Sequence, residues 1–369
     1  MKINLILNNE KVAVTPELIT YKIQQLLKLL QEQEVENQET FSTSNIDNQI
    51  NNVALLLRDM GYDITAKEVQ NIVKKDNPSD EKENLATNLY EALNFFLSKK
   101  KLIHQNNISI LYKIISNNTS NLNNNLFRVT NEVESLSYPS RYFKILDFNS
   151  VPSLFDQLIE FINIDDSQLS IFLNMQIVHL HNLAMSPFAQ YNAVLSKIIS
   201  LWYLNLHNIV GDISSFFKFY LEVIRLHQQE FQTVAAESIA SCDYTNFVLF
   251  IVEKLSRYTI YKQKVKKIVR QLRQKKKFFL APQEAKFLFF ILYYNLNQFD
   301  WKKIKQISKL VASKQYIMIN LSKLEKKYDL LSAETIKNRK FFSQSRFLKL
   351  LLSSMKNPNK NFASEKKNE

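Results

Sequence analysis

The chain has 369 residues, enough for two or three domains that each bury a core of their own. Only two of its residues are glycine, Gly61 and Gly211, and 46 % are hydrophobic. Sheets, sharp turns and glycine-rich phosphate loops need residues that tolerate positive φ, so the composition predicts a mainly α-helical protein. The formal net charge of +13 is a weak indication of an anionic partner, such as nucleic acid.

The single cysteine, Cys242, excludes an internal disulfide framework and any zinc site built from several thiolates. The apolar run at the start is much too short for a signal peptide, and no later run reaches the roughly 18 residues that a membrane span needs. We therefore expect a cytoplasmic protein without a membrane partner.

Helical periodicity begins after a short strand-like start. Thr15 is the expected N-cap and Pro16 the first helical residue of a segment in which Leu18, Ile19 and Ile23 share one face. Further helices are predicted near 49–60, 65–75, 81–100 and 106–117, before an asparagine-rich loop. Residues 126–148 alternate β-branched and aromatic side chains around Pro139, which predicts a short exposed hairpin or flap.

Helices dominate the rest of the chain. They are predicted over 151–163, 167–184, 190–207, 214–239 and 243–257, followed by a basic helix over 258–277. Three shorter helices and a β-wing are expected between 284 and 352, and the charged, asparagine-rich tail 353–369 is expected to be disordered. We divide the chain into an N-terminal helical region (1–78), a central domain (79–280), a C-terminal domain (281–352) and the tail.

The stretch SPFAQYNAV, residues 186–194, precedes a strongly apolar helix. A helix N-terminus exposes unpaired N–H groups and a partial positive charge, so a loop at this place could hold a phosphate. Close wrapping of a phosphate favours glycine, yet Tyr191, Ala193 and Val194 stand here. From the residues alone, an ordinary helix start is the simpler interpretation.

The order of residues, however, resembles the signature of the Fic family, His-Pro-Phe-x-Asp/Glu-Gly-Asn-Gly/Lys-Arg. Pro187, Phe188 and Asn192 match, Lys197 stands at the family's second basic position, and His179 lies seven residues ahead of the motif. Upstream, LFRVTNEV and the segment that ends in VPSLFDQLIEFIN look like the family's Phe-Arg strand, flap and following helix. The resemblance covers residues 80–255 and implies an α-helical bundle that transfers AMP from ATP to a hydroxyl group of a target protein.

The resemblance also implies roles for individual positions. The catalytic positions would be Ser186 and Asn192, and the nucleotide, with Mg²⁺, would be held by Gln190, Tyr191, Asn192, Ala193, Val194 and Lys197. Five of these positions depart from the family where the chemistry takes place. Ser186 replaces the histidine base, Gln190 the metal-binding acid and Val194 the phosphate-binding arginine, and Tyr191 and Ala193 replace glycines. Serine has no pKa near neutrality, and glutamine is a poor sole protein ligand for Mg²⁺.

Loss of a general base alone removes about 10²–10⁴ in rate, and loss of an electrostatic clamp a comparable factor. We therefore expect a pseudoenzyme with a binding or regulatory role, which uses neither ATP nor Mg²⁺ and has no metal site. The alternative is an active nucleotidyl- or phosphotransferase with a rearranged site. His179, His181 and Cys242 are expected to be packing residues.

Many Fic proteins carry an inhibitory helix with the motif Ser/Thr-x-x-x-Glu-Gly/Asn, whose glutamate pairs with the phosphate-binding arginine. Thr43, Asp47 and Asn48 in TSNIDN are the candidates for this motif. The same residues also fit a polar N-cap and turn.

The C-terminal domain, 281–352, resembles in its residues 299–347 the winged helix-turn-helix that longer Fic proteins append, although Val311 stands in place of the usual turn glycine. Its second helix would present Lys314, Gln315, Asn320 and Lys323 to a major groove, and Lys337, Arg339 and Lys340 on the wing would contact phosphates. A DNA-binding regulator is thus a further alternative, beside a protein-docking or purely structural role. Residues 262–277 hold nine basic residues and no acid, which fits either a solvated helix face or nucleic-acid contact. A homodimer and an unidentified target or regulatory protein complete the expected partners.

Overall fold

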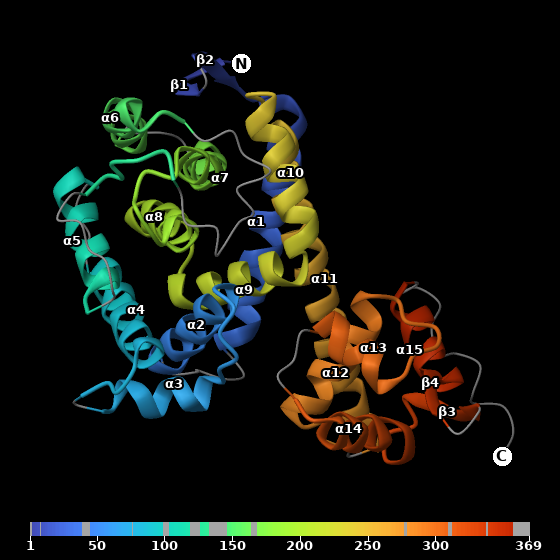
Figure 1. Cartoon of the computed structure of the whole chain (residues 1–369). Coiled ribbons are helices and arrows are strands. Elements are labelled where there is room, and N and C mark those ends of the chain that lie inside the picture. The colour runs from blue at the N-terminus through green and yellow to red at the C-terminus, as the bar shows by residue number, and fades with distance from the viewer. Residues whose placement is uncertain are drawn as a thin grey trace, which may run out of the picture. The chain divides into compact units, whose positions relative to one another are not determined.

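The computed structural model is mainly helical, as the composition predicts (Figure 1). It describes residues 2–7, 9–38, 45–75, 77–98, 103–118, 126–132, 146–163, 168–276, 279–308, 312–336 and 339–356. The chain forms two compact units, residues 1–256 and 257–369, so that the division falls inside one long helix.

Unit 1 starts with an antiparallel hairpin, β1 (Lys2–Leu7) and β2 (Glu10–Ala13), and Ala13 continues into a bridge with Asp243. Its helices are α1 (Pro16–Gln38), α2 (Asn45–Asp59), α3 (Ala66–Val73), α4 (Glu81–Ser98), α5 (Gln105–Ser116), α6 (Val151–Ile162), α7 (Gln168–Met185), α8 (Asn192–Leu206), α9 (Ile213–Leu226), α10 (Gln228–Ala240) and the first part of α11 (Thr245–Lys276).

The helices α7 and α8 form the centre of unit 1. Figure 1 shows them nearly end on, with α4 and α5 to one side and α1 and α10 to the other. Every residue from 192 to 204 is buried, including Trp202 and Tyr203. A helix that is apolar on all sides is stable only in the middle of a bundle, so the sequence of α8 determines its place.

Three helix boundaries differ from the predictions. The predicted helix 214–239 is two helices, because the chain breaks at His227, which ends α9 and starts α10. The predicted helices 243–257 and 258–277 are one helix, α11, since neither proline nor glycine interrupts the sequence there. In the predicted flap, the described residues 126–132 and 146–148 contain no strand, and residues 133–145 lie outside the described part.

Unit 2 contains the rest of α11, then α12 (Pro282–Tyr293), α13 (Trp301–Ser308), α14 (Lys314–Lys326), β3 (Leu331–Ile336), β4 (Arg339–Gln344) and α15 (Arg346–Lys356). The strands β3 and β4 pair in one antiparallel register from Leu331 opposite Gln344 to Ile336 opposite Arg339. Phe299 adds a bridge to Phe342 through two backbone hydrogen bonds of 2.9 and 2.7 Å. The helix α15 continues past 352, where we expected the disordered tail to begin, and residues 357–369 lie outside the described part.

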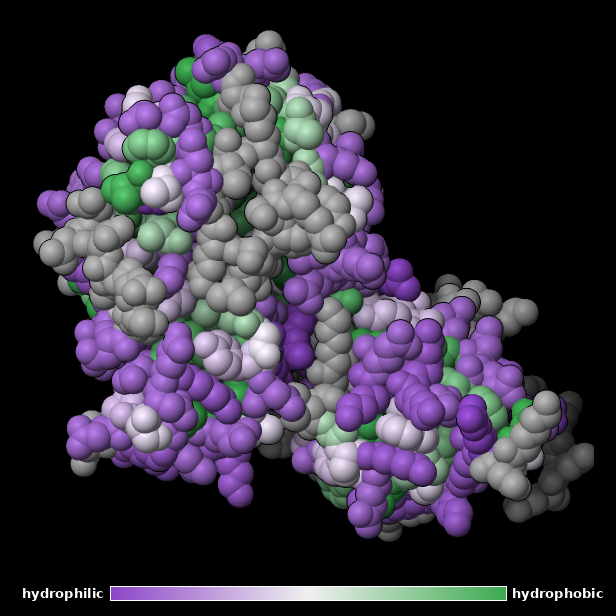
Figure 2. Space-filling model, in the orientation of Figure 1, coloured by the Kyte–Doolittle hydropathy of each residue, from purple (hydrophilic) through white to green (hydrophobic). Residues whose placement is uncertain are grey.

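Hydrophilic residues cover most of the visible surface of each unit, and apolar ones are scattered among them (Figure 2). Within the ranges that the structure describes, no helix combines the length and the apolar character needed to cross a bilayer.

Candidate functional site

The loop between α7 and α8 has a glycine-like backbone without a glycine. Ser186 follows the end of α7 with φ 42°, and Tyr191 precedes α8 with φ 63°. Left-handed values cost a residue with a Cβ roughly 1–2 kcal/mol, so the surrounding packing must hold them. Tyr191 stands at a position where the resemblance expects glycine, and the backbone adopts the conformation that glycine favours.

Asn192 closes this loop on itself. Its side-chain oxygen Oδ1 accepts a hydrogen bond from the Phe188 N–H at 2.9 Å, and its Nδ2 donates to the Phe188 carbonyl at 2.8 Å. Asn192 is buried, and Phe188 stacks on Tyr112 and lies edge-on to Phe155. The amide that we expected at the nucleotide therefore holds the turn, and it occupies the backbone N–H of Phe188.

Arg128 fixes the same loop from the segment before α6, a role that the sequence did not reveal. Its Nε donates to the Ser186 carbonyl at 2.9 Å, and its backbone N–H donates to the Pro187 carbonyl at 3.0 Å. The two terminal nitrogens donate to the carbonyls of Thr130 and Leu146. Burial lowers the pKa of Arg128, partly opposed by Asp147. An arginine inside the apolar LFRV stretch was the only signal of this contact.

The Ser186 hydroxyl is hydrogen-bonded to the last turn of the preceding helix. It donates to the Leu183 carbonyl of α7 at 2.8 Å. The histidines of α7 lie in the core: His179 Nδ1 is 2.7 Å from the Tyr220 hydroxyl, and His181 Nδ1 is 3.1 Å from that of Tyr244. Burial lowers the pKa of each histidine to about 3, with Lys197 as a second cause at His179. Both are neutral packing residues, out of reach of a substrate.

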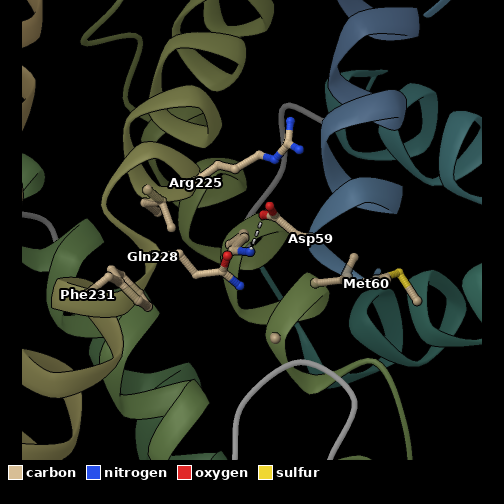
Figure 3. Close-up of a pocket in the computed structure, with 9 residues that line it drawn as sticks. Asp59, Met60, Arg225, Gln228 and Phe231 are labelled. Carbon is tan, nitrogen blue, oxygen red and sulfur yellow. Dashed lines mark hydrogen bonds and ion pairs between the residues drawn. The ribbon is translucent and has the colours of Figure 1, made fainter. Parts of the chain in front are cut away.

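A pocket lies beside the first turns of α8. Its lining comes from four helices and the residue after α2: Asp59, Met60, Ala193, Val194, Lys197, Ile224, Arg225, Gln228 and Phe231 (Figure 3). The pocket contains about 340 Å³ of empty space, part of it open to solvent. Three of the expected nucleotide-binding positions, Ala193, Val194 and Lys197, are therefore brought together in it. Ser186, Gln190, Tyr191 and Asn192 are not in its lining.

An ion pair spans this pocket. Lys197 Nζ lies 2.9 Å from Asp59 Oδ2, and the two side chains are only 4 % and 10 % exposed (Figure 3). Arg225 interacts electrostatically with the same carboxylate. Burial lowers the pKa of Arg225, and the negative charges of Asp59, Asp63 and Glu222 oppose that shift. Asp59 thus supplies negative charge to two cations, Lys197 and Arg225, in the lining of the pocket.

The inhibitory-motif candidates lie elsewhere on the helix that carries Asp59. Asp47 and Asn48 are in the first turn of α2, and Asn48 donates a hydrogen bond to the Ser215 hydroxyl at 2.8 Å. Asp59 is the last residue of α2, about 18 Å further along the helix axis. Thr43 lies outside the described residues. The structure therefore brings Asp59, and not Asp47, to Lys197 of α8, a pairing between residues 138 positions apart.

The DNA-binding candidates divide into two groups. Lys314, Gln315 and Lys323 lie on the exposed face of α14, and Arg339 is exposed on β4. Asn320 does not share that face: it is buried, and its amide donates to the Tyr316 carbonyl of its own helix. We correct the expectation for Asn320 accordingly. Lys337 and Val311 lie outside the described residues.

Comparison with known proteins identifies the fold. No protein-family model matches the sequence, and no curated protein is similar to it. Among solved structures, the chain is similar to a Fic family protein from Desulfovibrio desulfuricans G20, with a TM-score of 0.55 and 13 % sequence identity. The match covers 90 % of this chain and 97 % of the other. The class that the fold defines is therefore that of helical proteins with the Fic fold.

Proposed function

We propose that this chain is a Fic-fold protein that does not transfer nucleotides and acts by binding another macromolecule. The observation that carries the proposal is the Ser186 hydroxyl, which donates to the Leu183 carbonyl at the position of the family's general base. A serine without a neighbouring base cannot take the proton from a target hydroxyl. The alternative of an active transferase with a rearranged site needs another base, and the described residues around the loop offer none.

The residues that are present do not fit Mg²⁺ and ATP. Gln190 offers a neutral amide in place of a metal-binding carboxylate, and no group of three or more His, Cys, Asp or Glu side chains suited to a metal occurs in the described ranges. Val194 contributes an apolar wall to the pocket where the resemblance expects an arginine. Asn192 also takes the Phe188 N–H, one of the backbone donors of the loop.

In this proposal, Asp59 takes the place of a bound anion. Its carboxylate neutralises Lys197, which the resemblance assigns to a phosphate, and a phosphate that entered would meet like charge at 2.9 Å from that nitrogen. In this proposal Asp59 has the inhibitory role for which Thr43, Asp47 and Asn48 were the sequence candidates.

Calorimetric titration of the full chain with Mg²⁺ and ATP tests the proposal. We expect no binding at millimolar nucleotide. Asp59→Ala removes the internal anion, so this variant, and not the unaltered chain, should gain thermal stability from millimolar inorganic pyrophosphate. Binding of ATP by the unaltered chain in the micromolar range would refute the proposal.

For unit 2, the order α12, α13, α14, β3 and β4, with Phe299 bridged to β4, supports our interpretation as a winged helix. A homodimer and a cytoplasmic location also remain part of the proposal, the latter because Cys242 is the only cysteine.

A further inference from the structure

The positive charge of the protein belongs entirely to unit 2. Residues 257–369 contain 28 Lys and Arg against 7 Asp and Glu, a formal net charge of +21. Residues 1–256 contain 20 against 28, a net charge of −8. A coding sequence rich in adenine and thymine would enrich lysine throughout the chain. It therefore does not explain why the positive charge is confined to one of the two folded units. The division indicates that unit 2 meets a polyanion.

The charge is most concentrated on the part of α11 that belongs to unit 2. No acidic residue occurs between Glu253 and Glu284. The apolar stripe Tyr258, Val265, Ile268 and Leu272 is buried, and Tyr258 packs on Phe289 and Tyr293 of α12.

At 3.6 residues per turn, Lys266, Lys267 and Arg270 project from the side of α11 opposite to that stripe. Lys267 and Arg270 are exposed and Lys266 is half-buried. The helix is thus anchored by one side and presents cations on the other.

We propose that this basic face of α11, centred on Lys266, Lys267 and Arg270, binds duplex DNA through its phosphates without reading sequence. Duplex DNA carries one negative charge per about 1.7 Å, so a helix of this length can meet several phosphates. Lysine is depleted in protein–protein interfaces, which favour aromatic anchors. A membrane-surface helix needs an apolar face for the lipid, but that face of α11 is buried inside unit 2.

The helix α14, by contrast, is poorly equipped to read bases. Its exposed face carries the large apolar side chains Tyr316 and Ile319, and Asn320 is buried. Lys323 lies 3.5 Å from the Glu284 carboxylate, and Lys340 on β4 lies 2.6 Å from that of Glu325. These two cations already have a carboxylate partner, so they gain less from a phosphate.

The test measures the affinity of the full chain for a 20-base-pair duplex of arbitrary sequence by fluorescence anisotropy between 50 and 200 mM salt. The triple variant Lys266→Gln, Lys267→Gln and Arg270→Gln removes three phosphate contacts. The plot of log affinity against log salt concentration should therefore become shallower, its slope less negative by about 3. The affinity at 100 mM salt should fall by a factor of about 10². The matched control, Lys314→Gln with Gln315→Ala and Lys323→Gln on α14, should keep most of the affinity. A second triple variant, Lys266→Arg, Lys267→Arg and Arg270→Lys, keeps the three positive charges and should bind DNA as the unaltered chain does.

Circular dichroism melting confirms that the variants fold. Four results would overturn the proposal: no binding at 50 mM salt, equal loss in the α14 control, stronger binding to duplex RNA of the same length, or binding to phosphatidylserine vesicles without binding to DNA. Since unit 1 takes no part in this contact, the outcome is independent of whether nucleotide transfer is absent.

Discussion

The ion pair between Lys197 and Asp59 makes a strong prediction about the stability of unit 1. Its side chains are 4 % and 10 % exposed, and Arg225 is a second cation that interacts with the same carboxylate. Asp59→Ala leaves both cations without that charge in a poorly solvated place. Removal of one partner from a buried pair costs about 3–5 kcal/mol, so we expect a loss of that size in the free energy of unfolding.

The assay is urea unfolding followed by tryptophan fluorescence. In a Trp301→Phe background, Trp202 in the core of α8 is the sole tryptophan and reports on unit 1 alone. The matched control is Glu253→Ala, which removes the partner of Lys22 in an exposed pair and should cost no more than about 1 kcal/mol. Asp59→Leu combined with Lys197→Met should recover most of the loss, because a well-packed apolar pair is an adequate substitute for buried charges. If Asp59→Ala costs as little as Glu253→Ala, the Lys197–Asp59 pair does not behave as a buried ion pair and the reasoning is refuted.

Further predictions concern the loop and the core. Asn192→Ala leaves the buried Phe188 N–H and carbonyl without partners and should cost about 2–4 kcal/mol by the same unfolding assay, whereas a cost below 1 kcal/mol would contradict the clamp. His179 and His181 have pKa values lowered to about 3, whereas histidine in the unfolded chain titrates near 6.5, so stability should be full above pH 6.5 and fall as the pH drops towards 3, by about 1.4 kcal/mol per pH unit for each histidine. His181→Gln should reduce the loss of unfolding free energy between pH 6 and pH 5 by the contribution of one histidine. An unchanged pH dependence would show that burial of His181 does not cause the loss.

Much of the fold was predictable from the sequence because the relevant signals are local. The scarcity of glycine indicated helices, and the apolar stretch after Asn192 indicated a central helix behind the loop. Helix ends were less predictable, since the break at His227 contains no proline or glycine and α11 continues where we expected a boundary.

The candidate site was only partly predictable because it depends on tertiary contacts. No sequence pattern near Asp59 indicates that its carboxylate pairs with Lys197, which is 138 positions away. The short inhibitory pattern that begins at Thr43 instead predicts a functional acid, Asp47, at the opposite end of α2. Likewise, polar residues on α14 look equivalent in sequence, but packing within unit 2 buries Asn320, while Tyr316 is exposed.

The most direct test of the central claim is incubation of the purified full chain with ATP labelled on the α-phosphate, Mg²⁺ and a cell lysate, followed by detection of labelled protein. The account predicts no label on the chain or on any lysate protein above a heat-denatured control. Label that appears with the unaltered chain, and is lost in Ser186→Ala or Gln190→Ala, would contradict it.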